Sequence, residues 1–219
     1  MLYNAGLDPT AIIGGEVDTL GGNARLGSGE YIVAEADESD SSFLHLDPFY
    51  TVMTNLEMEH IDHFKTLARA KTAFKKFAGN TKKSGAVFYN IDDANLREVV
   101  KDHKGKKRSF GSSEAADIYP RNIEMNGFDT SFECVYHGRA LGTISIKVPG
   151  RHNVTNALAC VLVGLEAGLK FKQIAAALKD FSGAKRRFEL RADSGGVMLI
   201  EDYAHHPTEI RSVLAASRN

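Results

Sequence analysis

The chain has 219 residues, and 27 Lys+Arg against 28 Asp+Glu give it a formal net charge of −1. Its 43% hydrophobic and 25% charged residues are typical of a globular protein and argue against a disordered or membrane-inserted chain. The near-neutral charge removes the general electrostatic reason for binding nucleic acid. Cys134 and Cys160 are too few for a disulfide framework, and the N-terminus lacks the pattern of a secretory signal, so we expect a cytoplasmic protein.

Residues 11–111 alternate short β-rich runs with helical patterns, which is typical of a mostly parallel sheet flanked by helices. The expected strands are residues 31–34, 50–54 and 85–89. The helix between the last two is expected to face the core with Leu67, Ala70, Phe74 and Phe77, which recur at helical spacing. Asp92 can cap the helix that follows.

The pattern changes after this α/β region. Residues 117–148 are β-rich, and turn signals interrupt them at residues 126–127 and 137–138, which predicts a small antiparallel sheet added to the parallel one. The remaining expected elements are helices at residues 153–167 and 171–181, a strand at 197–200 and a helix that begins at Pro207. We therefore expect one α/β domain over residues 1–191 and the start of a second domain over residues 192–219.

In open α/β sheets, ligands bind beyond the carboxyl ends of the strands, so the residues after each expected strand are candidates for a site. The carboxylates that follow the first strand are Glu35, Asp37, Glu38 and Asp40. Such a density of negative charge repels itself unless a cation is present. The alternative is an exposed acidic loop, but at the end of a buried strand we favour a cation site.

The second expected strand is followed by His60 and His63, three residues apart. On a helix, this spacing would place both rings on one face and would be compatible with zinc. No further ligand spacing supports zinc, and the acids nearby are oxygen donors that suit magnesium or manganese. A lone histidine is more often a hydrogen-bonded structural residue, so His60 by itself is a weak candidate.

Three later stretches place polar groups at an expected hinge or helix start. Asn153 and Asn156 lie where amides and free N–H groups can bind a base or phosphate, although Asn153 is equally explained as an N-cap. Residues 185–188 (KRRF) offer guanidinium groups to phosphate and are equally typical of a charged hinge. In residues 202–207 (DYAHHP), two adjacent histidines are unusual on structural grounds alone.

Taken together and in this order, these residues resemble the Mur ligases, ATP-dependent enzymes that add amino acids to the peptidoglycan precursor. The stretches that carry the resemblance are residues 23–27 (NARLG), 35–40 (EADESD), 54–55 (TN) with 60–62 (HID), 149–153 (PGRHN), 185–188 (KRRF) and 202–209 (DYAHHPTE). The resemblance implies a P-loop-type central domain that uses ATP with Mg²⁺ or Mn²⁺. It also implies an acyl-phosphate reaction between UDP-N-acetylmuramate and L-alanine.

The resemblance implies roles for residues on the metal and substrate side of the site. Glu35 and His60 would bind the magnesium ion, with manganese as an alternative because an imidazole is an atypical magnesium ligand. Tyr203 and His205 would lie beside the substrate and the tetrahedral intermediate as catalytic residues.

It also implies roles on the nucleotide side. The residues placed near the adenine and ribose are His152, Asn153 and Asn156. Arg187 would contact the ATP phosphates across the hinge and contribute to catalysis, and Asp202 would bind the nucleotide. Asn23 would lie near the phosphate or the substrate.

One feature of the family is absent. The Gly-rich phosphate loop, Gly-x-x-x-x-Gly-Lys-Ser/Thr, does not occur in the 219 residues. The sequence therefore resembles a fragment, and we expect it to have no ligase activity and at most weak affinity for nucleotide. A ligase that recycles murein tripeptide shares residues 204–207 (AHHP), whereas residues 39–43 (SDSSF) favour the alanine enzyme. A metal-dependent hydrolase that uses His60 and His63, and a noncatalytic binding module, are alternatives outside the family.

Overall fold

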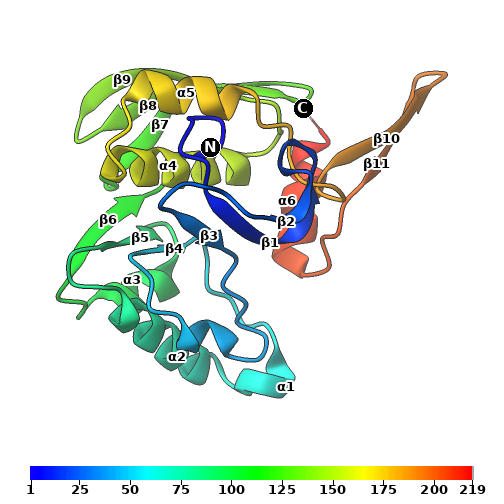
Figure 1. Ribbon diagram of the computed structural model, residues 1–219. Coiled ribbons are helices and arrows are strands. Elements are labelled where there is room, and N and C mark those ends of the chain that lie inside the picture. The colour runs from blue at the N-terminus through cyan, green and yellow to red at the C-terminus, as the bar shows by residue number, and fades with distance from the viewer. Residues whose placement is uncertain (219) are drawn as a thin grey trace.

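The computed structural model describes residues 1–218, and a six-stranded sheet forms its centre (Figure 1). In spatial order, its strands are β4 (Tyr50–Met53), β5 (Ala86–Asn90), β6 (Lys106–Phe110), β7 (Ile118–Asn126), β8 (Asp129–Tyr136) and β9 (Arg139–Ile146). β4 to β7 pair in parallel, and β7 to β9 pair antiparallel. The predicted antiparallel addition is therefore confirmed, and it is continuous with the parallel sheet through the pairing of Phe110 with Ile118.

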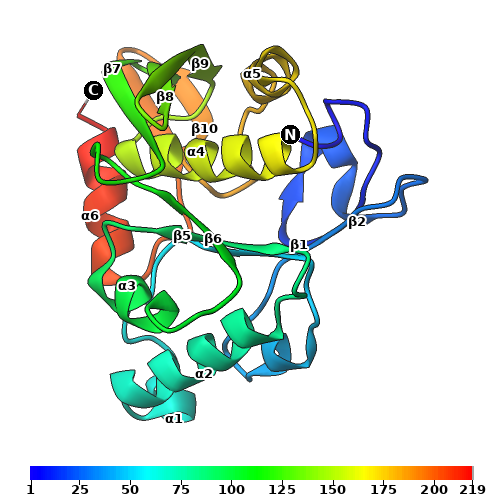
Figure 2. The same ribbon diagram turned by 90° about the vertical axis from the view of Figure 1, so that its left-hand side faces the viewer.

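Helices cover both faces of this sheet (Figures 1 and 2). One face carries α4 (Arg151–Glu166) and α5 (Phe171–Lys179), and the other carries α2 (Leu67–Asn80) and α3 (Ala94–Val100), with the single turn α1 (Ile61–Phe64) beside α2. Alternate residues of β5 enter the two resulting cores, because Phe88 packs in the cluster that contains α4 whereas Val87 packs with α2 and α3. Burial on both faces is characteristic of a parallel strand between helical layers.

The helix that the spacing of apolar residues predicts is confirmed as α2, in which Phe77 is buried. The predicted cap of α3 is wrong by one residue. Asp93 caps the helix, because its Oδ1 accepts a hydrogen bond from the backbone N–H of Leu96 at 2.9 Å. Asp92 lies too early to reach the first turn, and it accepts a hydrogen bond from the N–H of Ser112 at 2.7 Å.

A second sheet of three strands lies beside β4. Its strands, in spatial order, are β2 (Gly22–Arg25), β1 (Thr10–Val17) and β3 (Ile32–Ala34), with β1 and β3 parallel. The strand before the acidic stretch is confirmed as β3, but the expectation that it is buried is wrong, since all three of its residues are exposed. An apolar cavity of about 490 Å³ is lined by Val33 of β3, Val52 of β4 and Cys160 of α4, among other residues.

The C-terminal segment is defined here as β10 (Glu189–Ser194), β11 (Val197–Glu201) and α6 (Pro207–Ala216). The two strands form an antiparallel hairpin that projects from the body, and α6 packs beside α4 (Figures 1 and 2). Pro207 is the first residue of α6, as predicted. The predicted domain boundary at residues 191–192 falls inside β10, and the division into two domains stays a prediction. Within the described residues, no helix is long and apolar enough to cross a bilayer.

Candidate active site

The acidic stretch after β3 and the loop after β4 meet at His60. Ligand atoms of Glu38, Glu59 and His60 all lie within 4.8 Å of one another, and His60 Nε2 is 3.4 Å from Glu38 Oε1. His60 reaches this position with a left-handed backbone, φ 50°, as the N-cap of α1. The small cavity that these three residues line has a volume of about 20 Å³, enough for one water-sized ligand. Two carboxylates and an imidazole form a donor set that fits a divalent cation, with manganese favoured over magnesium by the nitrogen ligand.

Glu35, the carboxylate predicted to bind metal together with His60, has a different contact. Its Oε2 accepts a hydrogen bond from the backbone N–H of Gly14 at 2.6 Å. The backbone N–H of Glu35 donates to Ile12 O, which extends the pairing of β3 with β1 and turns the side chain toward Gly14. A Cβ at Gly14 would lie 2.9 Å from the carboxylate oxygens, so glycine allows this approach. The carboxylate in contact with His60 is thus that of Glu38, and the role of Glu35 stays a prediction.

His63 does not join the cluster of Glu38, Glu59 and His60. Its Nε2 lies 2.6 Å from Ser41 Oγ, and the only group of three or more metal-competent side chains found within residues 1–218 excludes it. The zinc arrangement that the His60 and His63 spacing would allow is therefore not formed. Hydrogen bonds from Ser39 lower the pKa of Asp37, which keeps this neighbouring carboxylate charged at neutral pH.

The N-terminus of α4 carries three of the predicted nucleotide-binding residues. The N-cap is Gly150, with φ 98°, rather than Asn153, whose Nδ2 donates to Pro149 O at 2.7 Å. Asn153 is the third residue of the helix, so the interpretation of Asn153 as an N-cap is wrong. Asn156 is exposed and lines the apolar cavity. Partial desolvation lowers the pKa of His152, the charge of Arg187 lowers it further, and the charge of Asp202 acts in the opposite direction.

The charges of Arg187 and Asp202 both act on His152. The hinge (residues 185–188) and the C-terminal segment therefore lie near the start of α4. The two oxygens of Asp202 accept hydrogen bonds from the backbone N–H groups of Phe188, at 2.8 Å, and Ala204, at 2.7 Å. Asp202 therefore fastens the end of the hinge to the turn before α6. The side chain of Arg187 is exposed, and no hydrogen bond or ion pair of its guanidinium is found within the described part of the chain. The guanidinium is thus accessible to an anion.

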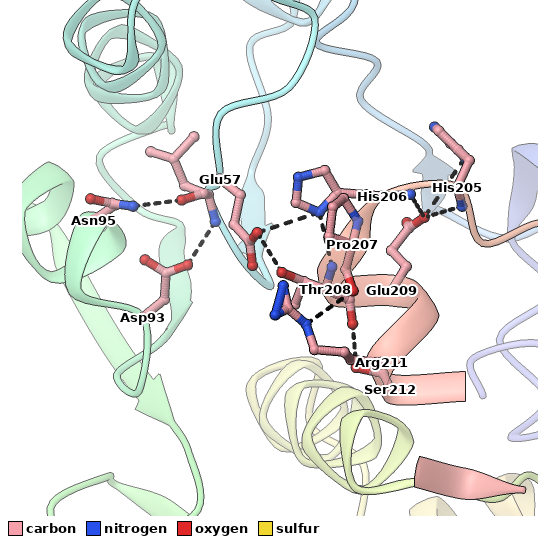
Figure 3. Close-up of polar contacts among 11 residues, drawn as sticks. Glu57, Asp93, Asn95, His205, His206, Pro207, Thr208, Glu209, Arg211 and Ser212 are labelled. Atoms are coloured by element: carbon pink, nitrogen blue, oxygen red, sulfur yellow. Dashed lines mark hydrogen bonds and ion pairs between the residues drawn. The ribbon is translucent and has the colours of Figure 1, made fainter. Parts of the chain in front are cut away.

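The double-histidine stretch lies immediately before α6 (Figure 3). The ring of Tyr203 packs edge-on against that of His205, with centroids 5.5 Å apart. His205 is exposed, whereas His206 is the N-cap of α6. Burial raises the pKa of Glu209, but hydrogen bonds from the backbone N–H groups of His205 and His206 outweigh it and lower the pKa overall. Asn23, in contrast, lies exposed on β2, and none of the contacts that form the site reaches it.

Two residues of this region were not singled out from the sequence. Glu57, in the loop after β4, accepts a hydrogen bond from Thr208 Oγ1 at 2.7 Å, although the two lie 151 residues apart (Figure 3). Both fall in or beside stretches that carry the family resemblance, which was the only available signal. The structure therefore brings the residues after β4 and the start of α6 into one site.

Comparison with known proteins identifies the family of this chain. Residues 19–164 match the middle domain of the Mur ligases. The chain belongs to the Mur ligase family. The resemblance predicted from the motifs is thereby confirmed, as is the predicted fold class of a mostly parallel sheet flanked by helices.

Individual Mur ligases match over almost the whole chain. It is 45% identical over 218 residues to the UDP-N-acetylmuramate–L-alanine ligase of Pelotomaculum thermopropionicum, covering 99% of this chain and 47% of that protein. The solved structure of UDP-N-acetylmuramate-alanine ligase MurC from Thermotoga maritima superimposes with a TM-score of 0.86 at 29% identity, covering 99% of this chain and 49% of that one.

A second solved ligase structure also matches the chain. UDP-N-acetylmuramate:L-alanyl-gamma-D-glutamyl-meso-diaminopimelate ligase from Neisseria meningitides matches with a TM-score of 0.75 at 28% identity, covering 84% of this chain and 61% of that one. This chain spans about half the length of the curated Mur ligases that it matches.

Proposed function

We propose that this chain supplies the ATP-binding part of a ligase that joins L-alanine to UDP-N-acetylmuramate. The observation that carries the proposal is the 45% identity to a UDP-N-acetylmuramate–L-alanine ligase across 99% of the chain. In this proposal, residues 1–191 form the ATP-binding domain, residues 192–219 begin the next domain, and the reaction takes place in the cytoplasm.

The proposed reaction has two steps. A carboxylate oxygen of the muramyl group attacks the γ-phosphorus of ATP, which forms an acyl phosphate and releases ADP. The amine of L-alanine then attacks the acyl carbon, and the tetrahedral intermediate expels phosphate as the amide bond forms. Phosphoryl transfer depends mostly on positioning and on neutralising negative charge, which is the chemistry that clustered carboxylates, a bound cation and an arginine can provide.

We propose that Glu38, Glu59 and His60 hold a Mg²⁺ or Mn²⁺ ion, with Glu35 as a further ligand. Support comes from the proximity of the first three side chains and from the small cavity that they line. Such an ion would neutralise charge on the transferred phosphoryl group and on the acceptor carboxylate. Glu35 hydrogen-bonds to Gly14 and would have to exchange this partner to reach the ion.

On the nucleotide side, we propose that His152, Asn153 and Asn156 bind the adenine and ribose. The lowered pKa keeps His152 uncharged at neutral pH, so that its ring nitrogens can donate one hydrogen bond and accept another. The exposed guanidinium of Arg187 is suited to the ATP phosphates, because a guanidinium group can donate hydrogen bonds to two phosphate oxygens at once.

The remaining assignments concern the substrate and the hinge. Tyr203 and His205 are exposed at the start of α6 and are proposed to lie beside the muramyl and alanyl groups. Asp202 is proposed to act on the nucleotide from the C-terminal segment, and its two backbone hydrogen bonds support a role in holding that segment next to the hinge. Asn23 is proposed to lie near the phosphate or the substrate.

The test is an assay of the complete enzyme that contains this chain, with release of ADP and phosphate as the readout. We expect turnover only when UDP-N-acetylmuramate and L-alanine are both present. Turnover with the murein tripeptide in place of L-alanine would instead assign the recycling activity. Breakdown of UDP-N-acetylmuramate without ATP, followed by chromatography, together with tightly bound zinc by metal analysis, would reject the ligase in favour of a hydrolase.

The 219-residue chain is a control for the same proposal. It has no Gly-rich phosphate loop, and the nest of N–H donors and the lysine in such a loop supply much of the affinity for phosphate. We therefore expect no ligase turnover from the chain by itself and no Mg-ATP binding in the micromolar range by isothermal titration. Micromolar binding would contradict this expectation.

A further inference from the structure

The loop after β4 is held firmly at Leu56. The backbone N–H of Leu56 donates to Asp93 Oδ2 at 2.8 Å, and its carbonyl oxygen accepts from Asn95 Nδ2 at 2.8 Å. The Leu56 side chain is buried in the core beneath α2 and α3. Both polar groups of one peptide residue are thus fixed to the start of α3, so Glu57 leaves the core from a defined point.

The start of α6 is also a defined turn. Pro207 occupies the first helical position, and Glu209 Oε2 accepts from the backbone N–H groups of His205 at 3.1 Å and His206 at 3.3 Å. This arrangement closes the capping box of the helix. The histidine pair therefore moves together with the first turn of α6 as one unit.

The Glu57 carboxylate joins these two units. Its Oε2 accepts a hydrogen bond from Thr208 Oγ1 at 2.7 Å and lies 3.4 Å from His206 Nδ1. His206 Nδ1 also accepts from the backbone N–H of Thr208 at 3.4 Å, and it cannot accept that bond and donate to Glu57 in the same protonation state. The bond from the Thr208 hydroxyl has no such conflict, so it is the contact that persists in every state of His206.

We propose that Glu57 is a positioning residue, which sets the turn bearing His205 at a fixed place relative to the loop bearing His60. This inference rests on the proposed ligase function, in which His60 lies on the metal side and His205 on the substrate side. The link matters because α6 is weakly anchored by apolar contacts, Ala216 being its one buried residue. A contact that would be minor on a rigid surface can then decide how the segment is oriented.

Hydrogen exchange of the 219-residue chain, followed by mass spectrometry over residues 203–212, tests the link itself. We expect Glu57→Ala and Thr208→Val each to speed exchange by about threefold to fivefold, the range for one partly exposed charged contact. The double variant should exchange no faster than Glu57→Ala, since that variant already lacks the bond that Thr208→Val removes. Ser212→Ala is the matched control, because the Ser212 hydroxyl donates to Thr208 O within α6 and does not contact the loop.

Kinetics of the complete enzyme test the positioning role. Glu57→Ala should lower kcat by about threefold to fivefold, the same factor as in exchange, and change KM for ATP less than twofold, because the chemistry needs both units in place whereas most of the proposed nucleotide contacts come from α4 and residues 185–188. Glu57→Gln retains an oxygen acceptor for Thr208 and should recover a large part of kcat. Unchanged exchange in the single variants, or additive effects in the double variant, would overturn the link even if the wild-type enzyme is an active ligase. An inactive wild type with coupled exchange would instead reject the proposed function alone.

Discussion

Helices α4 and α6 pack against each other, yet α4 buries seven residues whereas α6 buries one. α4 lies over the parallel sheet, and its Leu158 is completely buried in the main core. The C-terminal segment exposes apolar side chains, and Leu214 of α6 is 56% exposed. The comparison shows that α4 is part of the main core, whereas the C-terminal segment contacts the rest of the chain mainly through exposed and polar groups.

The largest difference should appear in a matched pair of leucine truncations. Leu158→Ala in α4 should lower the free energy of unfolding by about 2–5 kcal/mol, because it leaves a cavity in a closed core. Leu214→Ala in α6 should change it by less than about 0.5 kcal/mol. Urea denaturation of the two variants measures both values. Equal losses would show that α6 is as much a part of the core as α4.

A pair of glycine substitutions should give the next largest effect and tests the junction between the two helices. Gly150 adopts φ 98°, and a Cβ there would lie 2.6 Å from the His152 ring and 3.4 Å from Ala216 Cβ. Gly150→Ala should therefore cost about 1–3 kcal/mol of stability. Gly79→Ala in α2 meets no atom within 4 Å and should stabilise the protein by about 0.5–1 kcal/mol. Thermal unfolding should separate the two variants in opposite directions.

Measuring the pKa of His152 tests whether the hinge and the C-terminal segment lie beside α4. Partial desolvation by the surrounding chain lowers its pKa below the ordinary value near 6.5, so the neutral ring is favoured on folding. His152 therefore contributes stability that is complete above about pH 6.5 and is lost as the pH falls through its lowered pKa. In an NMR titration, Arg187→Gln should raise the pKa of His152, and Asp202→Asn should lower it further. A pKa that neither variant changes would place both residues away from α4.

The smallest effect is expected at the ion pair between the hinge and β1. Lys185 Nζ lies 2.9 Å from Glu16 Oε2 and 3.4 Å from Asp18 Oδ1, and all three side chains are well exposed. Solvent and salt screen such pairs, so Lys185→Ala should leave the unfolding midpoint unchanged within error. A clear loss, abolished in high salt, would show that the hinge depends on this pair.

The sequence carried strong local signals, and these were sufficient for much of the fold. Helical spacing predicted α2, and Pro207 marked the start of α6. Predictions failed where two neighbouring residues offered the same signal. Asp92 and Asp93 both precede α3, and only the exact path of the chain determines which carboxylate meets the N–H of Leu96.

In the candidate site too, the sequence predicted the stretches but not which of their residues make contact. The acidic stretch and His60 were recognised from the sequence, but four carboxylates within six residues cannot be distinguished without the contacts of each one. The pairing of β3 with β1 directs Glu35 to Gly14 and leaves Glu38 beside His60. The contact of Glu57 with Thr208 had no local signal at all, because it joins residues that are 151 positions apart.

The amino-acid sequence by itself determined the α/β class, the family and the stretches that are candidates for the functional site. These depend on periodicity, on turn residues and on motifs, each of which is complete within a few neighbouring positions. Only the tertiary structure decided which carboxylate faces His60, where α4 begins and what holds α6 against the loop after β4. Such contacts form between distant segments, and their geometry follows from the packing of the whole chain.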